Sequence, residues 1–301
     1  MNESGAQPKL VSWFWATRPF SLSAAIAPVL VGSGLAATAG SINWLLLGLA
    51  ITGSVAIQVG TNLTDEYSDH RKNRGIGKFL APHKVIQRGL LSERSVGAGI
   101  TAAFAYGAIA GLIIASQVGW PILIVGLASV AAAYFYAGGP KPLGSLGLGE
   151  PVVFLFMGPL MVMSAYYVQR QDLTLASFLV SIPIALIVTA ILHCNNLRDI
   201  SEDREVGKRS IAATIGVTPS RWLYAMLMTA AYIAISLIPF TGVISFWALL
   251  GLAPAPWAAG AIRNVFAANA RPAMNRLMVR SAKLHGWTGT ALAAGLYLSS
   301  I

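Results

Sequence analysis

Long apolar blocks alternate with short polar segments along the whole chain. Blocks of roughly 17 to 25 apolar residues are long enough to cross the hydrocarbon core of a bilayer as helices. We expect nine of them, at residues 20–39, 42–62, 95–116, 119–137, 150–167, 175–197, 220–240, 243–262 and 283–301. The pattern predicts an all-α fold, in which residues 1–301 form a single membrane domain that is a bundle of nine transmembrane helices.

Two of the nine blocks contain proline. Pro159 interrupts the fifth block, and Pro254 and Pro256 interrupt the eighth. Proline is tolerated in a spanning helix when neighbouring groups satisfy the backbone positions that it frees. Both blocks are therefore kept as spans.

Composition agrees with the hydrophobic pattern. Of the 301 residues, 55% are hydrophobic and 11% are charged, whereas soluble proteins have roughly 25% charged residues. Soluble multidomain folds are thereby excluded. The net charge of +10 comes from basic residues spread between the apolar blocks, so we expect no nucleic-acid partner. The single cysteine, Cys194, excludes an internal disulfide and a multi-cysteine metal site.

The basic residues also predict the orientation. With nine spans and a cytoplasmic N-terminus, Arg170 is the only one of the 21 Lys and Arg residues that falls on the outer side. Retention of Lys and Arg on the cytoplasmic side is the main orientation signal in membrane proteins. We therefore expect a multi-pass protein of the cytoplasmic (inner) membrane, in contact with membrane lipid.

Two acidic motifs follow the second and the sixth block. The first contains Asn62, Asp65, Glu66, Asp69 and Asn73, and the second contains Asn195, Asn196, Asp199 and Asp203. Residues three or four positions apart share one face of a continuing helix. Asp65 and Asp199 are 134 residues apart, as are Asp69 and Asp203. This offset indicates a parallel internal repeat, which places both motifs on the cytoplasmic side.

The motifs are rich in oxygen ligands and basic neighbours. Carboxylate and amide oxygens without thiols favour Mg²⁺. The predicted metal ligands are Asn62, Asp65, Glu66, Asp69, Asn196, Asp199 and Asp203. Nearby Lys78, Lys208 and Arg209 would neutralise a metal-bound diphosphate. Either motif alone is equally well explained as a hydrated loop of mixed charge, but the two together predict ionisation of a lipid diphosphate and prenyl transfer.

The chain resembles the UbiA superfamily of intramembrane aromatic prenyltransferases. The resemblance lies in Arg18-Pro19, the stretch from Asn62 to Asp69, Gly138-Gly139-Pro140 and Asn195-Asn196-Leu197-Arg198-Asp199. It implies nine spans, Mg²⁺ and a polyprenyl diphosphate donor. It further implies 1,4-dihydroxy-2-naphthoate as the acceptor, with loss of carbon dioxide and formation of a demethylmenaquinone. The first motif has Asp65-Glu66 where the family commonly has Asn-Asp, which leaves open which of the two binds metal.

The catalytic carboxylates are accordingly predicted to be Asp65, Glu66, Asp69, Asp199 and Asp203. The predicted substrate-binding residues are Arg18, Asn62, Asn73, Lys78, Lys84, Arg88, Tyr134, Tyr136, Tyr166, Asn195, Arg198, Lys208 and Arg209. Lys84 and Arg88 fit a lid over the diphosphate, or simply the retention signal. The three tyrosines fit either a pocket wall or the interfacial aromatic belt.

Other interpretations remain open. One is a prenyltransferase of this superfamily with another acceptor, such as 4-hydroxybenzoate, homogentisate, haem or a glycerol phosphate. Another is a polytopic transporter, although transporters usually place their binding groups near the midplane on broken helices. The basic residues from Arg263 to Lys283 are interpreted as topology signals that contact anionic lipid, and Glu202 as a solvated loop charge. His193 and Cys194 are interpreted as packed helix residues.

Overall fold

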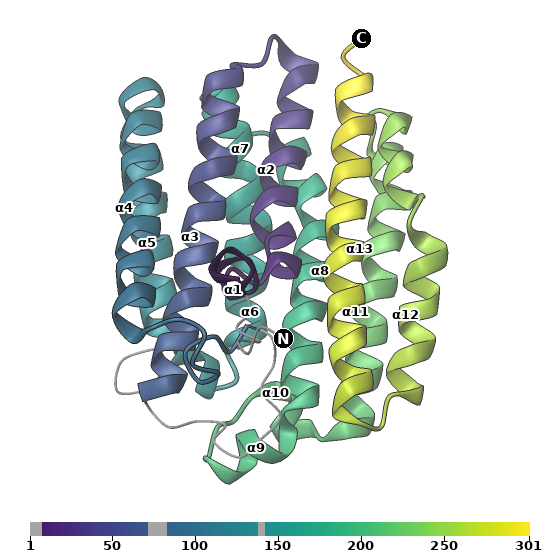
Figure 1. Cartoon of the computed structure of the whole chain (residues 1–301). Helices are drawn as coiled ribbons and strands as arrows, with labels where there is room; N and C mark the ends of the chain where they lie inside the picture. The colour runs from purple at the N-terminus through teal and green to yellow at the C-terminus, as the bar shows by residue number, and fades with distance from the viewer. Residues whose placement is uncertain (1–7, 72–82, 138–141) are drawn as a thin grey trace, which may run out of the picture.

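The computed structural model describes residues 8–71, 83–137 and 142–301, and within these ranges it is helical and contains no strand (Figure 1). The long α-helices stand side by side as one bundle, with α4 and α5 at one flank and α12 and α13 toward the other. The helices are α1 (Lys9–Ala16), α2 (Ser23–Ala36), α3 (Trp44–Arg71), α4 (Glu93–Val118), α5 (Pro121–Ala137), α6 (Gly149–Leu155), α7 (Met161–Arg170), α8 (Leu175–Arg198), α9 (Ile200–Glu205), α10 (Ile211–Ile215), α11 (Val217–Leu237), α12 (Ala255–Ala267) and α13 (Arg271–Leu298). The predicted all-α membrane bundle is confirmed.

Helical segments occupy the positions of all nine predicted blocks. In the described parts of the chain, five helices are long and apolar enough to cross a membrane: Trp44–Ser68, Glu93–Val118, Gly149–Arg170, Leu175–Arg198 and Val217–Thr241. A sixth span results if the pair Lys9–Ser21 and Ser23–Ala39, bent by 53°, is one span. The chain is thus an integral multi-pass membrane protein, and the count of nine spans stays a prediction.

Two predicted block boundaries differ from the structure. The last helix, α13, begins at Arg271 and not near residue 283, because arginine and lysine are good helix formers whose polarity does not interrupt backbone hydrogen bonding. The eighth block is divided into a 3₁₀ segment, Phe246–Leu252, and α12. Pro254 and Pro256 lie at this division, and proline cannot donate the backbone hydrogen bonds that a continuous helix requires.

Close helix contacts depend on glycine at two positions. A Cβ atom on Gly32 of α2 would lie 2.2 Å from the carbonyl oxygen of Val162 in α7. A Cβ on Gly158 would lie 2.1 Å from the Cβ of Ala185 in α8. Gly158 and Pro159 lie in a π-helical turn between α6 and α7, which accommodates the missing backbone N–H of the proline. Small residues of this kind let membrane helices pack with their backbones in contact.

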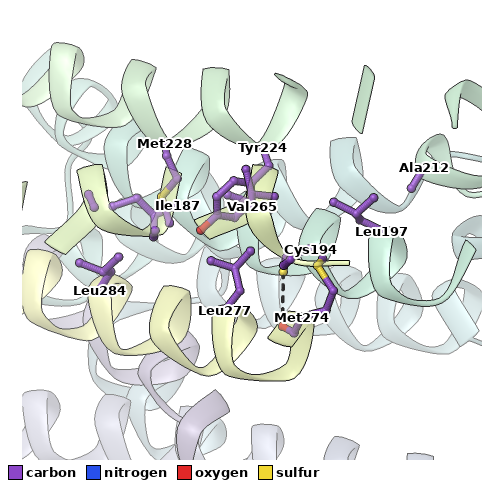
Figure 2. Close-up of a cluster of buried hydrophobic side chains, with 14 of the residues drawn as sticks. Ile187, Cys194, Leu197, Ala212, Tyr224, Met228, Val265, Met274, Leu277 and Leu284 are labelled. Carbon is purple, nitrogen blue, oxygen red and sulfur yellow. Dashed lines mark hydrogen bonds between the residues drawn. The ribbon is translucent and has the colours of Figure 1, made fainter. Parts of the chain in front are cut away.

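Two apolar clusters hold the helices that carry the acidic motifs. One joins α8 to α11, α12 and α13, with Ile187, Tyr224, Met228 and Leu284 among its buried members (Figure 2). The other includes Ala16, Leu63, Val85, Leu91 and Val96, and therefore packs the segment before α4 against α1 and α3. The ends of α3 and α8 are thus fixed by packing.

Candidate active site

Both acidic motifs lie at the same end of the bundle. Helices α3 and α8 run in the same direction and finish at the lower end in Figure 1. This parallel arrangement agrees with the repeat inferred from the offset of 134 residues. The structure therefore presents both motifs on one side of the membrane domain.

Asn62 fastens the N-terminal helices to the first motif. Its buried amide Nδ2 donates hydrogen bonds to the carbonyl oxygen of Thr17, at 2.8 Å, and to the hydroxyl of Ser21, at 2.9 Å. Arg18 lies between these two partners in a left-handed conformation, with φ at 52°. From this corner the Arg18 Nη1 forms an ion pair with Asp65 Oδ2 at 3.2 Å. The predicted residues Arg18, Asn62 and Asp65 are thus brought together.

Asp65 and Glu66 have different surroundings. The Asp65 side chain is 45% exposed, whereas that of Glu66 is 1% exposed. Glu66 Oε1 accepts a hydrogen bond from the backbone N–H of Ile86 at 3.0 Å, and its Oε2 lies 3.4 Å from Lys84 Nζ. Glu66 therefore holds the segment at residues 83–91 against α3, while Asp65 remains accessible.

The structure does not bring several other predicted site residues to the first motif, or does not describe them. Asn73 and Lys78 lie outside the described residues, as do the side chains of Asp69 and Tyr134. Arg88 is exposed on the helical turn that follows Lys84. Tyr166 is buried in a cluster with Val31 and Leu296. It lies toward the end of α7 that carries Arg170, whose guanidinium binds the carbonyl oxygens of residues 39–41 between α2 and α3, at the opposite end from the motifs.

The second motif is not one continuous helix, contrary to the prediction. Helix α8 ends at Arg198, and Asp199 leaves the helical conformation, with φ at −103° and ψ at 15°, before α9 begins. Aspartate competes for backbone hydrogen bonds and so favours helix ends over helix interiors. The N–H of Asp203 still donates to the carbonyl of Asp199 at 2.8 Å, which keeps the two carboxylates one turn apart.

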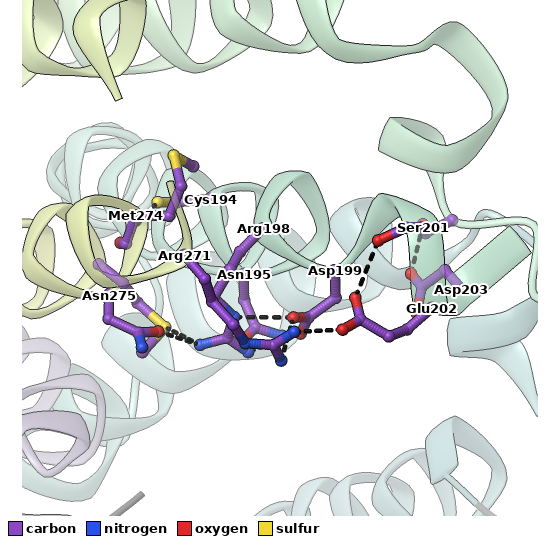
Figure 3. Close-up of polar contacts among 12 residues, drawn as sticks. Cys194, Asn195, Arg198, Asp199, Ser201, Glu202, Asp203, Arg271, Met274 and Asn275 are labelled. Carbon is purple, nitrogen blue, oxygen red and sulfur yellow. Dashed lines mark hydrogen bonds and ion pairs between the residues drawn. The ribbon is translucent and has the colours of Figure 1, made fainter. Parts of the chain in front are cut away.

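Asp199 is held by two arginines from different helices (Figure 3). Arg198 Nε donates to its Oδ1 at 2.8 Å, and Arg271 Nη2 of α13 lies 2.9 Å from the same oxygen. Arg198 also donates to the side-chain oxygens of Asn195, at 2.7 Å, and of Asn275, at 2.9 Å. The predicted pair Asn195 and Arg198 is therefore part of one network that α13 completes.

Glu202 corrects one prediction. It was expected to be a solvated loop charge, but it forms an ion pair with Arg271. Arg271 therefore bridges Glu202 and Asp199, and sequence reasoning missed it because α13 lies 72 residues further along the chain than Asp199.

Asp203 is nearly buried and has two partners. Lys208 Nζ lies 3.1 Å from its carboxylate, and the Ser210 hydroxyl donates to Oδ2 at 2.7 Å. Arg209 is exposed, and its backbone N–H donates to the carbonyl of Ser145 at 3.0 Å. The segment after α9 thus supplies a lysine to the second motif and attaches to the segment before α6.

A buried carboxylate that was not predicted supports Asn196. Glu150 Oε1 accepts hydrogen bonds from Asn196 Nδ2, at 3.1 Å, and contacts His193 Nδ1 at 2.9 Å, while His193 Nε2 contacts the carbonyl of Ser220 at 3.1 Å. His193 is therefore a bonded partner and not only a packed residue. The sequence feature that could have identified Glu150 is its position as a carboxylate in an apolar block, since such a group requires a buried partner.

Tyr136 and His83 are influenced by charged residues of both motifs. Tyr136 is close enough to Glu150, Asp65 and Asp203 for all three charges to act on its hydroxyl. The pKa of His83 is lowered to about 3, first by burial and then by the positive charges of Arg18, Lys84 and Arg198. The charges that act on Tyr136 and His83 therefore come from both acidic motifs.

The donor set fits a divalent cation that carries a phosphate. In the ranges that the structure describes, no group of three or more His, Cys, Asp or Glu side chains is arranged to hold a metal ion by itself. Instead Asp65, Asp199 and Asp203 are each paired with Arg or Lys. Hard oxygen ligands beside guanidinium and ammonium groups suit Mg²⁺ whose remaining ligands are phosphate oxygens.

Comparison with known proteins gives consistent matches. The profile of the UbiA prenyltransferase family matches residues 25–287. A 1,4-dihydroxy-2-naphthoate octaprenyltransferase of Bacillus subtilis is 30% identical over 94% of this chain and 91% of its own length. One from Mycobacterium tuberculosis is 32% identical over 84% of this chain and 86% of its own length. The solved structure of a UbiA homolog from Archaeoglobus fulgidus bound to DMAPP and Mg²⁺ has a TM-score of 0.61 at 12% identity, and covers 94% of this chain and 99% of its own.

Proposed function

Because this chain belongs to the UbiA prenyltransferase family, we propose that it transfers a polyprenyl group from a polyprenyl diphosphate to 1,4-dihydroxy-2-naphthoate. The reaction would release carbon dioxide and diphosphate and give a demethylmenaquinone. The names of the relatives from B. subtilis and M. tuberculosis support the acceptor. The observation that carries the proposal is the pairing of carboxylates with arginine and lysine in both motifs, at one end of an apolar bundle.

Mg²⁺ is the proposed cofactor, and the Mg²⁺ in the A. fulgidus structure supports it. The residues proposed to hold it are Asp65, Asp199 and Asp203, with Asn62, Asp69 and Asn196 of the same motifs. When bound, Mg²⁺ neutralises charge that develops on the leaving diphosphate. Glu66 contributes mainly by holding Lys84 and the segment at residues 83–91 in place.

The basic residues would exchange partners when substrate binds. Arg18, Arg198 and Lys208 now neutralise Asp65, Asp199 and Asp203. If these carboxylates held the cation, the three basic side chains would be available to contact the phosphate oxygens. Bidentate contact between arginine and phosphate is a strong, charge-assisted interaction, so the network is suited to orient a diphosphate.

The reaction balances without an added base. The allylic carbon–oxygen bond breaks, and its electron pair leaves with diphosphate. The electron-rich ring carbon that bears the carboxylate then forms the new carbon–carbon bond. Loss of carbon dioxide returns the electrons of the carbon–carboxylate bond to the ring, which restores its aromaticity. We propose that Tyr136, on which charges of both motifs act, shields the allylic cation from water.

The proposed location is the cytoplasmic membrane, with the site open to the cytoplasm and the prenyl chain among the apolar helices. The distribution of Lys and Arg supports this orientation. The C-terminal ends of α3 and α8, which carry the two motifs, lie at the end of the bundle that this orientation places inside.

Purified protein should be assayed with Mg²⁺ and farnesyl or geranylgeranyl diphosphate, in parallel reactions with 1,4-dihydroxy-2-naphthoate and with 4-hydroxybenzoate. We expect product from the naphthoate alone, and a loss of about 10²-fold or more in kcat for Asp199→Asn. Product from 4-hydroxybenzoate alone would show that the enzyme is a prenyltransferase of this family with a different acceptor. Absence of diphosphate binding would overturn the prenyl-transfer reading.

A further inference from the structure

A basic groove lies outside the site described above, between α12 and α13. Its basic residues are Arg276, Arg280 and Lys283, which follow one another at intervals of four and three residues and so share a face of α13. In the part of the chain that the structure describes, none of the three forms an ion pair with a carboxylate. The groove is therefore a concentration of positive charge that the proposed reaction does not use.

Two adjoining cavities form the groove. A cavity of about 370 Å³ is lined by Asn264, Ala268 and Leu277, and one of about 460 Å³ by Trp257, Lys283 and Trp287; Arg276 and Arg280 line both. Arg280 reaches across to α12, since a Cβ on Gly260 would lie 2.5 Å from its Nη2. The absence of a side chain at Gly260 thus makes room for the Arg280 guanidinium.

The polarity of the groove changes along the helix axis. Helix α13 begins at Arg271, at the end of the bundle that carries the motifs. Measured from Arg271 along the helix axis, Arg276 lies at about 7.5 Å and Lys283 at about 18 Å. Beyond Lys283 the rings of Trp257 and Trp287 meet edge to face, with centroids 6.0 Å apart, and both are about half exposed. The groove therefore has a charged end and an exposed aromatic end.

Unpaired arginine and lysine are costly where they border lipid hydrocarbon, because hydrocarbon does not solvate charge. A phosphate group would offset the cost, and basic pockets between membrane helices on the cytoplasmic side suit anionic head groups. We propose that the groove between α12 and α13 binds an anionic phospholipid, with its phosphate against Arg276 and Arg280 and its acyl chains against Trp257 and Trp287. The change from charged to aromatic lining favours such a lipid over a small soluble anion.

The lipid site adjoins the second motif. Asn275 lines the larger cavity, and its side-chain oxygen accepts the hydrogen bond from Arg198 Nη1, the arginine that holds Asp199. Lipid binding and the second motif therefore share a residue, although the test below does not depend on catalysis.

The test compares lipid binding by two variants of equal charge. Arg276→Gln with Arg280→Gln removes two charges from the groove, and Lys9→Gln with Arg94→Gln removes two exposed charges elsewhere. Each delipidated protein is titrated with phosphatidylglycerol or phosphatidylcholine and bound lipid is counted by native mass spectrometry. We expect phosphatidylglycerol to bind wild type and the control equally and the groove variant about tenfold or more weakly. Equal binding of phosphatidylglycerol by all three proteins would overturn the proposal. So would binding of phosphatidylcholine to wild type as strongly as phosphatidylglycerol.

A second measurement leaves Arg276 and Arg280 unchanged and changes the two tryptophans instead. Phosphatidylglycerol with brominated acyl chains should quench the tryptophan fluorescence of wild type more than brominated phosphatidylcholine does. The excess should disappear when Trp257→Phe and Trp287→Phe are combined. An excess that survives this change would place the lipid elsewhere, and the absence of any excess would contradict the site even if the arginine variant does not fold.

Discussion

At the scale of single residues, neighbouring carboxylates in the first motif have different tasks. Asp65 is accessible and paired with Arg18, whereas Glu66 is buried and binds Lys84 and the backbone of Ile86. Removing one partner of a buried charge-assisted contact leaves the other unsatisfied, which costs about 1–3 kcal/mol. The two side chains should therefore differ in whether their loss affects stability or turnover.

Asp65→Asn should lower kcat/KM for prenyl transfer by about 10²-fold while the melting temperature stays near that of wild type. Glu66→Gln should lower the melting temperature, because the charge opposite Lys84 is lost. Both values can be measured on detergent-solubilised protein by thermal unfolding and a diphosphate-release assay. The reverse pattern, a folded but inactive Glu66→Gln and an active Asp65→Asn, would assign the metal to Glu66.

His83 predicts a pH dependence of stability. Its pKa is about 3 in the folded protein, against about 6.5 in an unfolded chain. Between these values the unfolded chain binds a proton that the folded protein does not, so stability falls as the pH drops below about 6.5 and is unaffected by this group above it. His83→Asn should reduce the loss of melting temperature between pH 7.5 and pH 5.5 in substrate-free protein. An unchanged loss would show that His83 is protonated in the folded state.

At the scale of helices, small residues set the spacing that places the motifs. Gly32 brings α2 against α7, and Arg18, in the corner between α1 and α2, forms an ion pair with Asp65. Helix α13 also contributes to the site, because Arg271 and Asn275 complete the hydrogen-bond network around Asp199. The site therefore depends on helix contacts remote from the motifs in sequence.

Gly32→Ala should destabilise the protein by about 1–3 kcal/mol, because the added Cβ meets the Val162 carbonyl and α2 must move away from α7. Gly111→Ala in α4 is the matched control, since a Cβ there meets nothing within 4 Å. The control should be neutral or slightly stabilising through its better helix propensity. Equal melting temperatures for the two variants would mean that the α2–α7 contact is not tight in the membrane.

At the scale of the whole molecule, the distribution of Lys and Arg predicts a cytoplasmic N-terminus and nine spans. In a Cys194→Ala background, Asp172→Cys lies between α7 and α8, and Glu205→Cys lies at the end of α9 beside the second motif. In right-side-out membrane vesicles, an impermeant maleimide should label position 172 and should label position 205 only after permeabilisation. Labelling of both positions in sealed vesicles, or of 205 alone, would contradict the predicted topology.

The sequence alone determined the membrane bundle and the two motifs, because hydrophobic block length and motif spacing are local properties. The continuous helix through Asn62 and Asp65 was predicted correctly, whereas the break at Asp199 was not, since a cap depends on local hydrogen bonds that periodicity does not reveal. Only the tertiary structure decided that Glu66 is buried, that Glu150 and His193 support Asn196, and that Arg271 reaches Asp199. These contacts join residues from 18 to 72 positions apart. They arise from how helices and loops pack against one another, which the pattern within each helix does not specify.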